Sequence, residues 1–130
     1  MLVVDASAVV AALVDNGPEG VWGRSLLTEE LAAPHLLPAE ATDTLRRTVL
    51  ARDLSVDEAN LIHAELVRLP LRLYPYHPYA ERVWELRHNV TAYDAWYVAL
   101  AEALDAELAT LDRRLARSKG PRCRFLTPGR

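Results

Sequence analysis

The sequence is poor in cysteine and lysine and has no long run of apolar residues. Its one cysteine, Cys123, excludes an internal disulfide framework and a cluster of thiolate metal ligands. No apolar stretch approaches the roughly 20 residues of a membrane-spanning helix, so we expect no membrane segment. No basic segment precedes the first apolar run, so we expect no secretory signal. These absences favour a cytoplasmic protein.

The residues that are present suit one globular domain over residues 1–130. Of these, 51% are hydrophobic and 25% charged, which excludes a disordered chain and allows a core. The net charge of −3 does not indicate a nucleic-acid-binding protein. After Asp112, however, every charged residue is basic: Arg113, Arg114, Arg117, Lys119, Arg122, Arg124 and Arg130. Arginine suits phosphate because its planar group donates two parallel hydrogen bonds, although a solvated tail explains the pattern equally well.

Short apolar segments alternate with helical ones along the chain. We predict strands at Leu2–Val4, Leu31–Pro34, Pro70–Pro75, Glu107–Thr110 and Cys123–Leu126. We predict helices over Ala6–Leu13, Glu19–Leu31, Leu37–Arg52, Ser55–Leu69, Pro78–His88 and Tyr93–Leu104, with one or two turns after Asp112. This alternation is typical of an α/β fold whose parallel sheet has helices on both faces.

Four acidic residues are candidates for a site at one edge of that sheet. Asp5 directly follows the first strand, and Asp112 comes just after the fourth. In open α/β sheets, ligands bind at this carboxyl edge. Asp94 is the single acid near the start of a strongly apolar helix, where the helix dipole favours negative charge. Glu40 lies in the third helix, which could direct its carboxylate over the strand ends.

Each acid also has an ordinary structural explanation. Asp5 and Asp112 suit the N-cap of a helix. Asp94 follows Thr91 by three residues and resembles the second member of a capping pair. Glu40 suits an exposed acid that pairs with a nearby arginine. Taken one at a time, the acids leave both interpretations open.

Considered together, the four acids indicate a metal site. If they converge, like charges raise each other's pKa, and a divalent cation relieves the repulsion. Oxygen ligands suit Mg²⁺ or Mn²⁺ rather than Zn²⁺, and the histidines form no zinc motif. Such ions can activate a water and stabilise a leaving oxygen in phosphodiester hydrolysis. The hydroxyls of Ser7 and Thr110 would orient the acids or bond to the backbone.

Four blocks of sequence resemble the PIN-domain ribonucleases and occur in that family's order. They are Val-Val-Asp-Ala-Ser-Ala (3–8), Pro-Ala-Glu-Ala-Thr-Asp-Thr-Leu-Arg (38–46), Tyr-Asp-Ala-Trp-Tyr-Val-Ala-Leu-Ala-Glu (93–102) and Leu-Ala-Thr-Leu-Asp-Arg-Arg-Leu (108–115). Within the family, the chain is most similar to the VapC-type toxins of type II toxin–antitoxin pairs. The similarity spans nearly the whole chain, and the family's acids fall on Asp5, Glu40, Asp94 and Asp112.

The resemblance implies a single PIN domain with a three-layer α/β/α fold around a mostly parallel sheet of about five strands. It implies an endoribonuclease toxin that depends on Mg²⁺, or on Mn²⁺, held by the four acids. It also implies an RNA substrate, a homodimer and inhibition by a VapB-like antitoxin. Asp43 stands where many relatives carry Asn. It would strengthen metal binding, alter substrate preference or simply face Arg47.

Two other functions compete with this interpretation. A non-catalytic PIN-fold module that binds RNA or protein would show no cleavage with any divalent metal. Transfer through an aspartyl phosphate is disfavoured, because Ser7 stands where a phosphatase of that kind needs a second acid. The tryptophans Trp22, Trp84 and Trp96 are expected to pack in the core rather than to stack on bases.

Overall fold

Five parallel strands form one sheet in the order β3-β2-β1-β4-β5. The computed structural model of the chain describes residues 1–129. The strands are β1 (Leu2–Val4), β2 (Leu31–Pro34), β3 (Leu71–Tyr74), β4 (Glu107–Ala109) and β5 (Phe125–Leu126). In the central strand β1, Leu2 pairs with Leu31 of β2 on one side and with Glu107 of β4 on the other. The predicted parallel sheet is confirmed.

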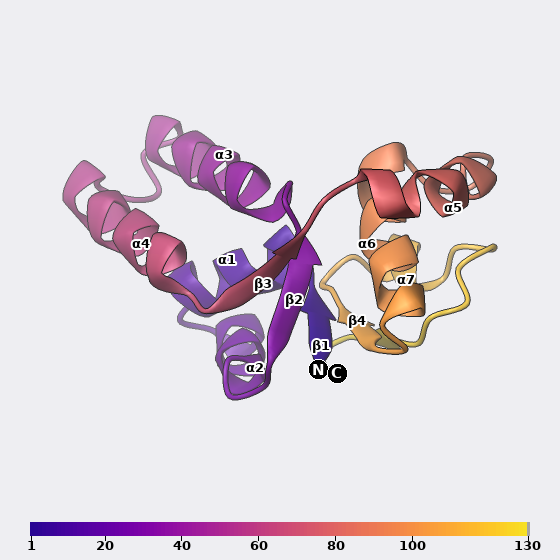
Figure 1. Cartoon of the computed structure of the whole chain (residues 1–130). Coiled ribbons are helices and arrows are strands. Elements are labelled where there is room, and N and C mark those ends of the chain that lie inside the picture. Colours follow the sequence, from indigo (N-terminus) through magenta and orange to yellow (C-terminus); the bar gives the residue numbers. More distant parts are fainter. Residues whose placement is uncertain (130) are drawn as a thin grey trace.

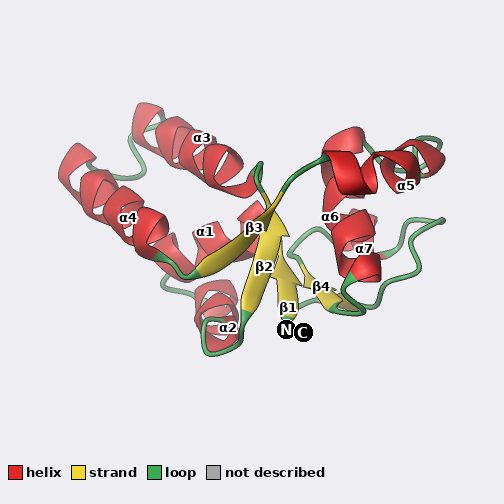
Figure 2. Cartoon of the chain, in the orientation of Figure 1, coloured by secondary structure: helices red, strands yellow, loops and turns green. Residues whose placement is uncertain are grey.

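Helices cover both faces of this sheet, which gives three layers (Figure 1). The helical segments are α1 (Ala6–Val14), α2 (Pro18–Leu26), α3 (Leu37–Leu50), α4 (Val56–Arg68), the 3-10 turn η1 (His77–Tyr79), α5 (Ala80–Glu85), α6 (Ala92–Ala103) and α7 (Arg113–Ala116). Helices α1 to α4 lie on one side of the strands and α5 to α7 on the other (Figure 2). The three-layer α/β/α fold implied by the sequence is confirmed.

Three predictions about local structure are wrong. The second helix ends at Leu26, because Leu31 must be extended to pair with Leu2 in the sheet. The helix predicted over 78–88 is a 3-10 turn followed by α5, which ends at Glu85. Trp84 is 67% exposed instead of packed in the core, and the guanidinium of Arg87 lies 4.6 Å from the centre of its ring.

The core positions the carboxyl edge of the sheet. Val3, Ala32 and Leu108, in the three central strands, are fully buried. Helix α6 contacts all three strands and is buried along most of its length, as its apolar sequence predicted. The residues that follow β1, β2 and β4 are therefore anchored to a closely packed core that excludes water.

Candidate active site

Asp5 occupies the end of β1 and is held by three hydrogen bonds. Its Oδ1 accepts from Ser7 Oγ at 2.6 Å and from the backbone N–H of Ala8 at 3.1 Å, and its Oδ2 accepts from Thr110 Oγ1. The side chain is therefore both the N-cap of α1 and a fixed carboxylate at the sheet edge. Burial raises the pKa of Asp5, and these hydrogen bonds act to lower it. The pKa of Asp5 is nevertheless raised overall.

Two hydroxyls join Asp5 to the loop that follows β4. Thr110 is fully buried, and its Oγ1 accepts from the backbone N–H of Asp112 at 2.9 Å while donating to Asp5. Ser7 Oγ accepts from the backbone N–H of Leu111 at 3.1 Å. Both alternatives considered for these hydroxyls hold, because each one donates to the Asp5 carboxylate and accepts from a backbone N–H group. Because the bonds cross between neighbouring strands, they fix Asp112 relative to Asp5.

Asp112 is exposed and caps α7. Its Oδ1 accepts from the backbone N–H groups of Arg114 and Leu115 at 2.9 and 3.1 Å. Its Oδ2 accepts no hydrogen bond from residues 1–129, so one oxygen is available to a ligand. Asp112 therefore both caps a helix and lies at the edge of the sheet.

Glu40 is oriented by a residue that the sequence did not indicate. Tyr97 of α6 is fully buried, and its hydroxyl donates to Glu40 Oε1 at 2.6 Å. Burial raises the pKa of Glu40, the Tyr97 hydrogen bond opposes that rise, and the charges of Asp94 and Asp5 add to it. The predicted pairing of Glu40 with an arginine is not what the structure shows. The sequence did contain one signal for a role of Tyr97 in the site. Tyr97 follows Asp94 by three residues, and this spacing places both side chains on one face of the helix.

Asp94 lies half-buried in the first turn of α6. Its backbone N–H donates to Thr91 Oγ1 at 3.2 Å, so Thr91 is the helix cap. Burial raises the pKa of Asp94, and the charges of Asp112 and Asp5 raise it further. The structure thus brings the four predicted acids around one edge of the sheet, where the charges of neighbouring acids contribute to the raised pKa values of Asp5, Glu40 and Asp94.

The donor chemistry of this edge fits a hard divalent cation. Within residues 1–129, no three His, Cys, Asp or Glu side chains are placed to hold one ion directly. Mg²⁺, however, keeps several waters and is usually bound through one or two carboxylates. Burial is the largest cause of the raised pKa values of Asp5, Glu40 and Asp94. The charges of neighbouring carboxylates raise these pKa values further, and a bound cation relieves that repulsion. The residues therefore fit Mg²⁺ or Mn²⁺ with water completing the coordination.

Two hollows flank the acids. One, of about 290 Å³, contains Asp94, Asp112 and Arg114 among its lining residues. The other, of about 370 Å³, contains Glu40, Asp43 and Arg47. Asp43 forms ion pairs with Arg46 and Arg47 on the exposed face of α3. Of the three outcomes considered for Asp43, the structure shows the pairing with Arg47.

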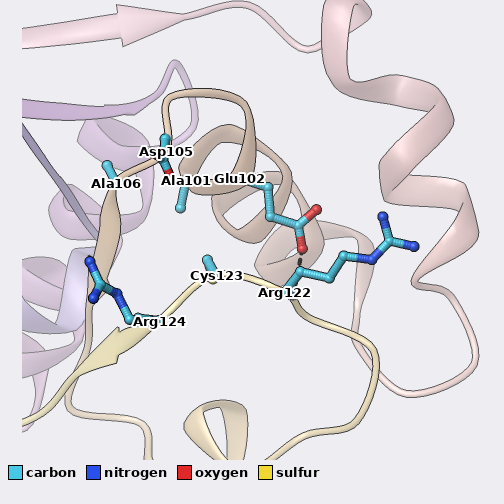
Figure 3. A pocket seen from close by; sticks show the side chains of 7 residues that line it. All are labelled: Ala101, Glu102, Asp105, Ala106, Arg122, Cys123 and Arg124. Carbon is cyan, nitrogen blue, oxygen red and sulfur yellow. Dashed lines mark hydrogen bonds between the residues drawn. The ribbon is translucent and has the colours of Figure 1, made fainter.

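A larger cavity, of about 380 Å³, lies at the other end of the sheet, beside the residues that lead into β4. Figure 3 shows Glu102 and the backbone of Arg122 in hydrogen-bond contact across it, next to Cys123. Glu102 also accepts from Arg82 Nε at 2.7 Å. These contacts join the C-terminal segment to α5 and α6, so we interpret this region as a structural clamp.

The fold and the acidic edge define a class of parallel α/β proteins with carboxylates at the ends of the central strands. A family model described as "PIN domain" matches residues 2–120. The chain is 49% identical to Ribonuclease VapC1 of Mycobacterium tuberculosis over 93% of its length and 92% of that protein. It is 41% identical to Ribonuclease VapC9 of the same species, over 95% and 94% of the two chains. The chain belongs to the PIN-domain family, alongside the VapC ribonucleases.

A solved structure supports the fold independently. The complex VapBC2 from Rickettsia felis, bound to a DNA fragment from its promoter, contains a chain that superposes with a TM-score of 0.67. The superposition covers 98% of both chains at 15% identity. This similarity concerns the fold alone.

The structure described here contains no helix long and apolar enough to cross a membrane within residues 1–129.

Proposed function

We propose that the chain is a metal-dependent endoribonuclease and the toxin of a toxin–antitoxin pair. The observation that carries the proposal is the gathering of Asp5, Glu40 and Asp94 from three different elements, with every pKa raised. The ribonuclease names of relatives that align over nearly the whole chain support it. Such a toxin acts on RNA in the cytoplasm, which is where we place it.

The four acids would have different roles in metal binding. Asp5 and Asp94 would be the main ligands of Mg²⁺ or Mn²⁺, and Glu40 and Asp112 would complete the site directly or through water. When bound, the cation supplies Lewis-acid activation of a water and stabilisation of the leaving oxygen. Ser7 and Thr110 hold the Asp5 carboxylate in one orientation, which a metal ligand requires. Tyr97 does the same for Glu40.

Arginines near the acids would bind the RNA backbone. Arg114 lines the hollow that contains Asp94 and Asp112, and is the best placed. Arg46 is paired with Asp43, and Arg113 donates to the carbonyl of Pro128 at 2.9 Å, so both would have to exchange a protein contact for a phosphate. Phosphate contacts of this kind weaken as salt is added.

The proposed protein partners are a VapB-like antitoxin and a second copy of the chain. Apolar side chains exposed on α3 and α4, including Leu50, Leu61 and Val67, offer area that a protein partner would cover. A solved structure of the same fold is the VapBC2 complex from Rickettsia felis, and the VapC names of the curated relatives agree with that assignment, which supports a partner of this kind.

RNA cleavage by the purified chain tests the proposal directly. We expect cutting with Mn²⁺ or Mg²⁺ and none with EDTA. Asp94→Asn should lower the rate by about a thousandfold, since a metal ligand contributes several kcal/mol and each tenfold corresponds to 1.36 kcal/mol. The measurement is the initial rate on a labelled RNA.

Glu81→Gln is the matched control, because Glu81 is an exposed acid in the first turn of the neighbouring helix α5. It should leave the rate unchanged. RNA that stays intact with every divalent metal would reject the nuclease and favour the non-catalytic binding module. Full activity in Asp94→Asn would reject the ligand assignment.

Tyr97→Phe isolates the hydrogen bond to Glu40. Because that bond lowers the pKa of Glu40, its loss should raise this pKa further. Cleavage needs the ionised carboxylate, so the acidic limb of the pH–rate profile should move to higher pH. At a fixed neutral pH, the rate should fall by about tenfold, as for other residues that orient a metal ligand.

Tyr93→Phe is the control for this variant, since Tyr93 lies on the same helix but is 64% exposed. It should reproduce the wild-type profile. An acidic limb that stays in place in Tyr97→Phe would show that Tyr97 serves packing alone.

A further inference from the structure

The hollow beside Glu40 also contains an ion pair on the same helix. Its lining residues, around a volume of about 370 Å³, include Glu40, Asp43 and Arg47. Nη1 of Arg47 is paired with Oδ2 of Asp43, and Nη2 donates to Thr44 Oγ1 at 3.3 Å. Asp43 is paired with Arg46 as well, at 3.4 Å. A cationic side chain is therefore held by an acid at the hollow that borders the candidate active site.

Helix α3 sets the direction in which Arg47 points. The helix begins at Leu37, shortly after β2 ends, so its first turn lies at the edge of the sheet that carries the acids. Asp43 and Arg47 follow Glu40 by three and seven residues, which places them on one face of the helix. Side chains on a helix lean toward its amino end, and the contacts of Arg47 with Asp43 and Thr44 follow that rule. The Arg47 guanidinium is therefore directed back toward Glu40 and the acidic edge.

The ion pair is exposed, so its partners can be exchanged. The side chain of Arg47 is 62% exposed and that of Asp43 is 50% exposed. Pairs of this kind contribute little to stability, so a phosphate can replace the carboxylate at little cost. A guanidinium donates two parallel hydrogen bonds to a phosphate as it does to a carboxylate. Arg47 is therefore available to an anionic ligand, and Asp43 is the group that competes for it.

The hollow on the other side of the acids also contains an arginine. Its lining residues include Asp94, Asp112 and Arg114. Helix α3 lies on one face of the sheet, and α6 and α7 lie on the other (Figure 1), so the two hollows flank the acids from opposite faces. An RNA strand continues on both sides of the phosphate that is cleaved. Arg114 and Arg47 are therefore placed to meet the strand on the two sides of a phosphate held at the acids.

We propose that Arg47 binds a phosphate of the RNA strand on the α3 side of the acids, and that Asp43 weakens this contact by competing for the same guanidinium. The inference rests on the proposed function and adds a positioning residue and its competitor to it. RNA is favoured over an acidic segment of a protein partner because the hollow borders Glu40, so a strand cleaved at the acids passes beside it.

The RNA affinity of Arg47→Ala tests the phosphate contact. The probe is a fluorescein-labelled 12-nucleotide RNA of mixed sequence, and fluorescence anisotropy is recorded on the full chain in EDTA, so that the RNA is not cut. Arg47→Ala should weaken binding by about fivefold, the upper range for one exposed charge pair. The slope of log Kd against log salt concentration should fall by about 0.7, the value for one phosphate contact with a single strand. With Mn²⁺, initial rates should show a KM raised by a similar factor and a smaller change in kcat.

Asp43→Asn tests the competition. Removal of the carboxylate charge frees the Arg47 guanidinium, so we expect RNA binding to tighten by about threefold. This gain should disappear in the double variant Asp43→Asn/Arg47→Ala, because no guanidinium is then left to free. Both side chains are largely exposed, so all three variants should melt close to the wild-type temperature.

Arg68→Ala and Asp57→Asn are the matched controls. Arg68 is an exposed residue at the end of α4, just before β3 begins, and therefore lies toward the opposite edge of the sheet. Asp57 is an exposed acid in the first turn of the same helix. Both control variants should bind the RNA as the wild type does, with the same salt dependence.

Several results would overturn the inference. One is an equal change in a variant and its control, which would show a general effect of charge. Unchanged RNA affinity in Arg47→Ala would also overturn it, as would a gain from Asp43→Asn that persists without Arg47. If a chain with any of these results still cuts RNA, the proposed function stands and only the inference fails. A wild-type chain that neither binds nor cuts RNA would overturn the proposed function itself.

Discussion

Replacing Asp5 by Asn should abolish RNA cleavage while leaving the fold intact. Asp5 is the most buried of the four acids, and its carboxylate is fixed by Ser7, Ala8 and Thr110. Asn has nearly the same shape but carries no charge to bind a cation. We expect a rate at least about a thousandfold lower, about 4 kcal/mol of lost transition-state stabilisation.

The same substitution should not destabilise the metal-free protein. Because the folded protein raises the pKa of Asp5 above 3.8, it holds this proton more tightly than the unfolded chain does. Ionisation of Asp5 therefore costs stability as the pH rises from 3.8 through the raised value. Asn avoids that cost, so the melting temperature at pH 7 should be unchanged or higher in EDTA.

Asp57→Asn is the control for both measurements, since Asp57 is an exposed acid in the first turn of α4. It should leave cleavage and melting temperature near the wild-type values. Cleavage at the wild-type rate by Asp5→Asn would remove Asp5 from the site. A collapse of the melting temperature would show that its role in the capping of α1 outweighs the charge.

Of the substitutions proposed for this protein, Glu102→Ala should cause the largest decrease in the free energy of unfolding. Glu102 is 15% exposed and accepts from Arg82 Nε at 2.7 Å, Arg82 Nη2 at 3.1 Å and the backbone N–H of Arg122 at 2.7 Å. Its removal leaves the Arg82 guanidinium, itself only 21% exposed, without its main partner. Unpairing a partly buried charge costs about 2–4 kcal/mol. In a domain of this size, that lowers the melting temperature by about 5–15 °C.

The loss should depend on pH in a defined direction. Burial acts to raise the pKa of Glu102, but the hydrogen bonds from Arg82 and Arg122 lower it below 4.5 overall. The stabilisation is therefore complete above pH 4.5 and declines as the pH falls through the lowered value. The difference in melting temperature between wild type and Glu102→Ala should shrink below pH 4.5.

Glu85→Ala is the control for the clamp. Glu85 pairs with the same arginine at 3.2 Å but is 54% exposed, so its loss should cost less than about 1 kcal/mol. Equal effects of the two substitutions would contradict the clamp. An RNA cleavage rate that is unchanged in Glu102→Ala at low temperature would confirm that the clamp is separate from the acidic edge.

The sequence by itself determined the class of fold and the four candidate acids. Apolar runs bounded by Gly, Pro and Asp predict buried strands, and the runs at 2–4, 31–34 and 107–109 are strands in the sheet. Local signals such as the capping box at Ser55 and Glu58 are also confirmed, because capping depends on residues close in the chain. The same locality left the acids ambiguous: Asp5 and Asp112 do cap helices, and this does not exclude a second role.

Only the tertiary structure decided which residues hold the acids and which side chains remain exposed. Glu40 and Tyr97 are far apart in sequence, and their hydrogen bond exists because α3 and α6 meet at one end of the sheet. The Thr110–Asp5 bond likewise requires β4 to pair beside β1. The exposure of Trp84 and the pairing of Tyr76 with Trp96 depend on how α5 and the loop after β3 pack. The amino-acid sequence encodes periodicity and capping through neighbours in the chain, whereas burial and long-range hydrogen bonds arise only when distant segments pack together.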